Sequence, residues 1–152
     1  MHDTVTFHKN GMFYWLPVIL WMAVIFWMST GTFSSAHTSR FIVPMLHFLF
    51  PSLLPEDLYM IHEAIRKAGH AVEYFILGLL VFRAFRRGSS QAWRLRWAIY
   101  SVIWVVCYAM GDEFHQSSVA ERNASLTDIG IDSMGGVLSQ ISIILWRFRR
   151  GT

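Results

Sequence analysis

The sequence has few charged residues and a single cysteine. Only 15% of its 152 residues are Asp, Glu, Lys or Arg, whereas about 25% is usual in a soluble domain. Cys107, which lies in an apolar stretch, is the only cysteine. Its being single excludes an intrachain disulfide and a metal site built from several cysteines. Hydrophobic residues make up 54% of the chain, more than a water-soluble core of this length can bury. These values predict an integral membrane protein.

Common catalytic signatures are also missing. No GxSxG elbow, P-loop or HExxH motif is present, so the usual nucleophile, nucleotide and zinc-protease patterns give no support to an enzyme. The formal net charge of +3 is compatible with nucleic-acid binding, but the basic residues lie mostly between or after apolar stretches. Because this placement is typical of membrane topology, we expect no nucleic-acid partner.

Long apolar runs predict an all-α integral membrane bundle of about four transmembrane helices, in a single domain covering residues 1–152. The predicted spans are residues 13–29, 68–85, 97–111 and 129–146, close to the roughly 20 residues that cross ~30 Å of hydrocarbon. Residues 41–55 are apolar as well, but Pro44, Pro51 and Pro55 leave no run long enough to span. We expect them to be interfacial or re-entrant, and residues 56–67 to be a polar helical lead-in.

Basic residues are unevenly shared between the two sides of this four-span arrangement. Nine of the thirteen Lys and Arg fall on the side that holds both ends of the chain. Cytoplasmic loops carry the excess of positive charge. We therefore predict a multi-pass protein of the cytoplasmic (inner) membrane, with both termini in the cytoplasm and its polar cluster on the outer face.

Ionisable and polar residues gather at the predicted outer ends of the last three spans. They are Lys67, His70, Glu73 and Tyr74, then Asp112, Glu113, His115 and Gln116, and finally Arg122, Asp128 and Asp132. Many are three or four apart, which places them on shared helical faces. A charge at the bilayer centre costs about 2.5–3.5 kcal/mol even on the translocon scale, so such residues usually pair or face a cavity. Taken singly, each of these residues is explained by a structural role, such as capping a helix end or pairing two helices by a hydrogen bond. Taken together, they predict one polar pocket between the last three spans.

The chemistry of the side chains divides this group into two roles. An imidazole beside a buried carboxylate can transfer protons, so the catalytic candidates are His70, Glu73, Asp112 and His115. The substrate-binding candidates are Lys67, Tyr74, Glu113, Gln116, Arg122, Asp128 and Asp132. Lys67 and Arg122 carry the positive charges that would contact an anion.

Three interpretations of the site stay open. The pocket catalyses a reaction, or it binds lipid or antibiotic without turnover, or it belongs to a divalent-metal-dependent intramembrane hydrolase. His70, Glu73, Asp112, His115 and an aspartate of the last span would suit zinc or a related ion. Hydrogen bonds between His and carboxylates produce the same clustering without metal, so no cofactor is assigned and enzymatic activity stays undecided.

Small residues in the last span predict a close helix contact. Gly135 and Ser139 are four apart, which is a small-xxx-small pattern. Such spacing lets the backbone of another membrane helix approach closely. The pattern does not indicate which helix is the partner.

Two stretches resemble the VanZ-like membrane family, named for a protein associated with teicoplanin resistance. They are KAGHAVEYFILGLLVFRAF and DEFHQSSVAERNASLTDIGIDSMGG, and the FSS from Phe33 to Ser35 fits as well. The resemblance covers most of the chain and implies a small helical envelope protein. The resemblance does not imply a reaction, but it suggests an effect on glycopeptide susceptibility. Our leading hypothesis is therefore that the outward-facing polar pocket handles a cell-envelope or lipid-linked anionic molecule. The family commonly has an aromatic residue and Pro-Gly before the arginine, where this chain has Ser117, Ala120 and Glu121.

Overall fold

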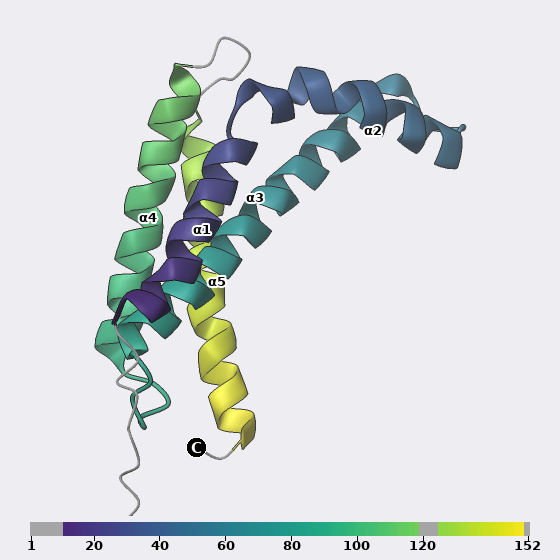
Figure 1. Ribbon diagram of the computed structural model, residues 1–152. Helices are drawn as coiled ribbons and strands as arrows, with labels where there is room; N and C mark the ends of the chain where they lie inside the picture. Colours follow the sequence, from purple (N-terminus) through teal and green to yellow (C-terminus); the bar gives the residue numbers. More distant parts are fainter. Residues whose placement is uncertain (1–10, 119–124, 151–152) are drawn as a thin grey trace, which may run out of the picture.

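A computed structural model describes residues 11–118 and 125–150, which fold into helices (Figure 1). The elements are α1 (Gly11–Met28), the short 3₁₀ helix η1 (Gly31–Phe33), α2 (Ser35–Leu49), α3 (Pro55–Arg86), α4 (Leu95–Ser117) and α5 (Leu126–Arg150). None of the described residues forms a strand. The prediction of an all-α fold is therefore confirmed.

α3 is the longest helix and the centre of the structure. Pro55 is the first residue of the helix, where the backbone N–H has no partner within the helix, so its absence costs no hydrogen bond. The negative charges of Glu56 and Asp57 in the first turn interact favourably with the positive end of the helix dipole. The helix ends at Arg87, which adopts a left-handed conformation with φ of 48° and is followed by Gly88. The sequence predicted a polar helical lead-in at residues 56–67 that feeds a span at residues 68–85, and the structure has both in one continuous helix of 32 residues.

Among the described residues, three helices, α1, α3 and α5, are long and apolar enough to cross a membrane. α4 has 23 residues, which is also sufficient length, but its Trp and Tyr residues and its polar C-terminal turn lower its mean hydropathy. Large apolar side chains on the outer faces of these helices are exposed, among them Ile19, Ile103 and Leu145. This arrangement suits a bundle surrounded by lipid, and a fourth span formed by α4 stays a prediction.

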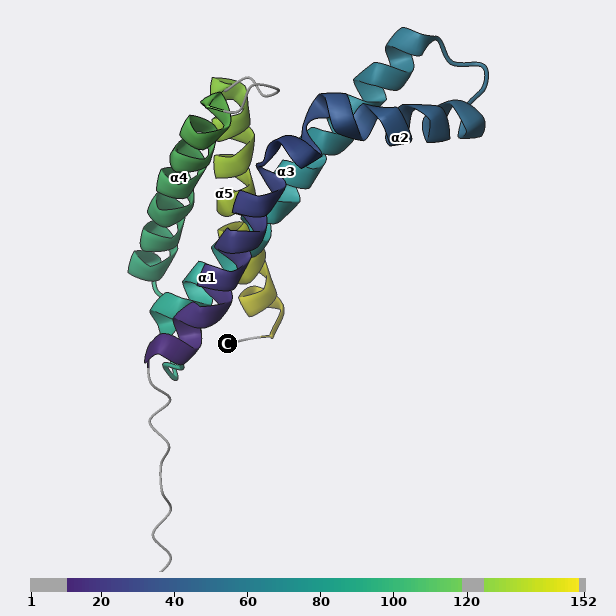
Figure 2. The same cartoon turned by 45° about the horizontal axis from the view of Figure 1, so that its top comes forward.

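α2 is a 15-residue helix that is too short to span a bilayer. It starts at Ser35, earlier than the predicted apolar segment 41–55, because Ser34 caps it by accepting a hydrogen bond from the His37 N–H at 3.4 Å. α2 then lies against the first half of α3, where Leu46 and Leu58 are buried. Figure 2 shows that this hairpin projects away from the rest of the bundle.

The packing of α3 on α5 depends on glycine. A Cβ atom at Gly135 would collide with the backbone oxygen of Ala71, and one at Gly78 would collide with the Ser139 hydroxyl. The Gln140 side-chain amide also donates to the Gly78 carbonyl at 3.3 Å. The small-xxx-small pattern therefore does mark a close helix contact, and α3 is the partner.

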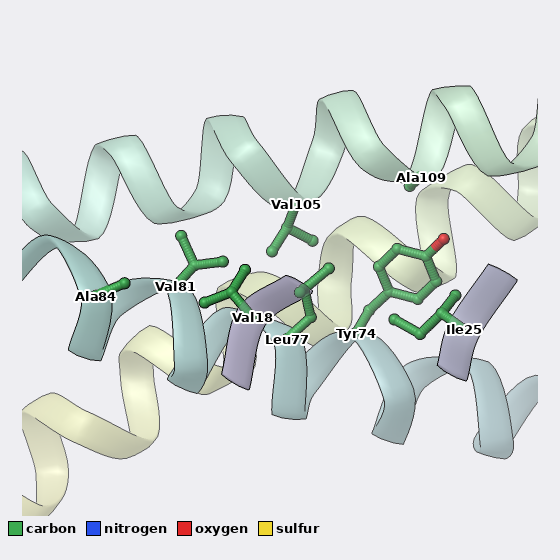
Figure 3. Packing of buried hydrophobic residues seen from close by; sticks show 8 residues of the cluster. All are labelled: Val18, Ile25, Tyr74, Leu77, Val81, Ala84, Val105 and Ala109. Carbon is green, nitrogen blue, oxygen red and sulfur yellow. The ribbon is translucent and has the colours of Figure 1, made fainter. Parts of the chain in front are cut away.

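A small apolar core joins α1, α3 and α4 (Figure 3). Val18 of α1 lies near Leu77 of α3 and Val105 of α4, Ile25 of α1 lies beside Tyr74 of α3, and all of them are buried. Two hydrogen bonds to backbone carbonyls reinforce the contact: the Trp21 indole donates to Glu73 at 2.9 Å, and the Tyr108 hydroxyl donates to Met22 at 2.6 Å. Such packing and interhelical hydrogen bonds stabilise helix bundles in lipid.

The bundle has two chemically different ends. The basic end holds the start of α1, the C-termini of α3 and α5 and the start of α4, with Arg83, Arg86, Arg87, Arg94 and Arg96 among its residues. The polar end holds the C-termini of α1 and α4, the start of α5 and the projecting hairpin. Gly11 and Arg150, the outermost described residues, both belong to the basic end.

Candidate functional site

Near the polar end, α3, α4 and α5 enclose three carboxylates, one amide and one phenol side chain. We call this group the packed carboxylate cluster: Tyr74, Asp112, Glu113, Gln116 and Asp132. The Tyr74 hydroxyl donates to Asp112 Oδ2 at 3.2 Å, and the Gln116 side-chain amide donates to the same oxygen at 2.9 Å. Every member of the cluster is buried. The hydrogen bonds let α3 and α4 hold a carboxylate away from water.

Glu113 connects α4 to the start of α5. Its Oε2 accepts a hydrogen bond from the backbone N–H of Ser125 at 2.8 Å. The Ser125 hydroxyl in turn accepts from the Thr127 N–H at 3.2 Å, one of the otherwise unpaired donors at the N-terminus of α5. Glu113 therefore has a structural role that positions the two helix ends.

Asp132 of α5 pairs with a histidine of α3. His70 Nδ1 lies 3.4 Å from Asp132 Oδ1, and the Asp132 side chain is fully buried while that of His70 is 15% exposed. Within the described part of the chain this ion-pair contact is not a hydrogen bond, and neither Asp132 oxygen has a hydrogen-bond partner. A buried carboxylate is costly unless paired, so His70 is the contact that makes Asp132 tolerable at this depth.

His70 also faces a small cavity, which we call the polar pocket. It has a volume of about 110 Å³ and lies between the C-terminus of α1, η1, α2 and α3. Its walls are formed by Met28, Ser29, Phe33, Thr38, Arg66, His70 and Glu73. The sequence predicted a pocket between the last three spans, whereas the walls of this cavity are formed by α1, η1 and α2 together with α3. A separate cavity between α4 and α5 is lined by Glu113.

Polar contacts between α2 and α3 form the rim of the polar pocket. The Thr38 hydroxyl lies 3.0 Å from His62 Nε2, and His62 is fully buried. The Ser35 hydroxyl donates to Glu63, whose carboxylate also accepts from Arg66 Nη1 at 3.1 Å. These contacts hold the start of α2 against α3 and fix the position of the Arg66 guanidinium.

The structure divides the predicted site residues into two groups and separates others from both. His70 and Glu73 line the polar pocket, and the packed carboxylate cluster contains Tyr74, Asp112, Glu113, Gln116 and Asp132. Asp128 is half-buried in the first turn of α5. Lys67 is exposed and does not line the pocket, and the His115 ring packs on Phe26 of α1 with their centroids 4.5 Å apart. Arg122 lies outside the described residues.

The sequence analysis did not predict the pocket and rim residues of two stretches of the chain. Arg66, Glu63 and His62 precede His70 by four, seven and eight positions, which is the spacing of one helical face, so extending the His70 pattern backward would have found them. Ser29 and Thr38 belong to a Ser- and Thr-rich segment that has no helical period and was interpreted only as an interfacial connection. Their approach to His70 depends on the tertiary fold.

The metal interpretation gains no support from the geometry. Within residues 11–118 and 125–150, no three His, Cys, Asp or Glu side chains are arranged to hold a metal ion. Asp112 is engaged by Tyr74 and Gln116, and His115 packs on α1. These two residues therefore do not join His70 and Glu73 in a common ligand set.

Long apolar helices define an integral membrane protein, and its buried ionisable residues gather near one end of the bundle. Comparison of sequences makes the assignment specific: this chain belongs to the VanZ/LLP1 family, whose pattern matches residues 13–147. No significant match was found among curated proteins or among solved structures.

Proposed function

We propose that this VanZ/LLP1 family protein binds an anionic group of a cell-envelope or lipid-linked molecule in the polar pocket, where His70 exchanges a proton with it. The observation that carries the proposal is the position of His70. One side of its ring lines a cavity that also contains a guanidinium, and its Nδ1 faces a fully buried carboxylate. Imidazole, carboxylate and an anion-binding group next to a cavity are the parts needed for acid–base chemistry.

Arg66 is the group that would receive the anion. Its guanidinium lines the polar pocket and offers a planar fork of N–H donors suited to a phosphate or carboxylate. The cavity, at about 110 Å³, is small. That space fits one anionic group of a ligand, so the remainder of the molecule would lie outside in the lipid or at its surface.

His70 would act through the nitrogen that Asp132 does not face. Because Nδ1 lies against Asp132 Oδ1, Nε2 is left for a ligand in the pocket. Asp132 is then a positioning residue, since it orients the ring and favours its protonated form without touching the ligand. Glu73, on the pocket wall, is the second ionisable group able to meet the ligand.

Binding without turnover is the second candidate, and one observation favours it. Of the four predicted catalytic residues only His70 and Glu73 line the cavity, while Asp112 is held inside the packed carboxylate cluster. A protein with this pocket would sequester an envelope lipid or an antibiotic by its anionic group. In both candidates we propose that the polar end faces outward and the basic end faces the cytoplasm, because positive charge marks the cytoplasmic side.

Susceptibility to teicoplanin in a sensitive host that expresses the protein tests the proposal. We expect wild-type protein to raise the inhibitory concentration, and His70→Gln to return it to that of cells without the protein. His47→Gln is the matched control, because His47 is an exposed histidine on α2 that does not line the pocket. Immunoblots of membrane fractions must show equal amounts of each variant.

Asp132→Asn separates the two candidates. The amide keeps the shape of the carboxylate but cannot favour a protonated His70, so proton transfer should be lost while the pocket stays intact. Asn at this position should abolish resistance if His70 exchanges a proton, and resistance that persists would favour binding alone. Full resistance with His70→Gln at wild-type protein levels would overturn both.

A further inference from the structure

A second cavity lies at the basic end of the bundle, far from the polar pocket. It has a volume of about 450 Å³, and its walls include Leu79, Phe82, Arg83 and Arg86 of α3 and Ile143 and Trp146 of α5. Figures 1 and 2 both show why it exists: the C-terminal turns of α5 diverge from the end of α3. Arg86 is 16 positions from His70 on the same helix, about 24 Å at 1.5 Å per residue.

The cavity combines apolar walls with two guanidinium groups. Arg86 Nε donates to the carbonyls of Ser89 and Gln91 at 3.2 and 3.0 Å, which fixes this side chain at the cavity. Arg83 is exposed, and its guanidinium lies 5.8 Å from the centre of the Tyr14 ring. Within the described residues, neither arginine forms an ion pair with a carboxylate. Their positive charge is therefore not neutralised by a carboxylate of the described part of the chain.

We infer that this cleft between α3 and α5 binds an anionic phospholipid. The phosphate would contact Arg83 and Arg86, and an acyl chain would run along Leu79, Phe82 and Ile143. Basic pockets between membrane helices recognise anionic head groups in this manner. A soluble phosphate compound would match the arginines but leave the apolar walls of the cleft uncovered.

The cleft differs from a general basic surface in its shape. Arg94 and Arg96 also carry positive charge at this end, but their guanidiniums lie 5.1 and 6.0 Å from the centre of the Trp97 ring and do not line the cleft. Arg83 and Arg86 are one helical turn apart, so both charges can face the same bound group. The site is independent of the proposed function, because it shares no residue with the polar pocket.

Quenching of tryptophan fluorescence provides the test, because Trp146 forms part of the wall. Purified full-length protein in a neutral detergent is titrated with phosphatidylglycerol or phosphatidylcholine that carry the same brominated acyl chains. We expect phosphatidylglycerol to quench at lower concentration, and Trp146→Phe to remove most of that difference. Equal quenching by both lipids would overturn the inference.

Two variants and a soluble competitor sharpen the result. Arg83→Gln should raise the half-maximal phosphatidylglycerol concentration about five-fold, the equivalent of ~1 kcal/mol per arginine, while Arg96→Gln removes the same charge outside the cleft and should change it little. Ser142→Phe, which keeps both arginines but fills the cleft, should weaken binding as well. Equal shifts with Arg83→Gln and Arg96→Gln would indicate general surface charge and overturn the inference. Displacement of phosphatidylglycerol by millimolar inorganic phosphate would show a phosphate site that does not need the lipid, and would overturn it too.

Discussion

The packed carboxylate cluster and the polar pocket lie on two sides of α3 and use similar residues differently. In the cluster, Tyr74 and Gln116 both donate to one oxygen of the buried Asp112 carboxylate. In the pocket, Arg66 and Glu73 line open space. Ionisable residues at membrane depth therefore do not all indicate a ligand site, since some stabilise helix contacts. Hydrogen-bonded packing around Asp112 and open space beside Arg66 and Glu73 distinguish the two, and His70 is the residue that touches both regions.

Gly135→Ala should have the largest effect on this comparison. Its Cβ would meet the Ala71 carbonyl too closely, so α3 and α5 must separate and His70 must move away from Asp132. We expect a loss of roughly 3 kcal/mol in the free energy of unfolding, the upper range for overpacking. Thermal unfolding in detergent measures it. Gly130→Ala is the matched control, because no atom lies within 4 Å of its added Cβ; equal stability of both variants would contradict the close contact.

Tyr74→Phe should have a smaller effect, limited to the packed carboxylate cluster. It removes the hydroxyl that donates to Asp112 while Gln116 still donates to the same oxygen. We expect about 1 kcal/mol less stability and an unchanged teicoplanin phenotype. Tyr100→Phe on the exposed face of α4 serves as the control. A lost phenotype with unchanged stability would move Tyr74 from the structural group to the ligand site.

Arg66→Gln and Lys67→Gln should differ in function but hardly in stability. Each removes one positive charge from neighbouring positions of α3, and Arg66 lines the polar pocket whereas Lys67 is exposed outside it. We expect changes in stability within about 0.5 kcal/mol for both, since the ion pair with Glu63 is partly exposed. Teicoplanin susceptibility should return to the background level only with Arg66→Gln. The reverse result would place the anion near Lys67.

Much of the fold could be predicted from the sequence because apolar runs and helical spacing are local signals. The helices appear near their predicted positions, and Gly135 with Ser139 marked a close contact before its partner was known. The sequence placed Asp112, Glu113 and Gln116 in one polar turn, and the structure has all three buried there, with Gln116 donating to Asp112. Each of these features depends on residues close in sequence.

The location of the pocket could not be predicted in the same way. It depends on α1 ending at Met28 and on α2 folding back so that Thr38 reaches His62, which is a contact between residues 24 positions apart. Helical spacing also cannot separate Asp132, which is fully buried, from Asp128 one turn earlier, which is half-buried. That difference arises from the approach of α3.

The unbroken length of α3 ties the pocket to the thickness of the membrane. A helix of 32 residues extends about 48 Å, well beyond a hydrocarbon core of ~30 Å. Such a helix accommodates the difference between its length and the bilayer thickness by tilting. Glu63 and His62, which form the rim contacts of the pocket, move with the tilt because they belong to the same continuous helix. A thicker bilayer would bring α3 more upright and lift the pocket relative to the head groups, so lipid composition itself would set which part of an envelope lipid meets His70.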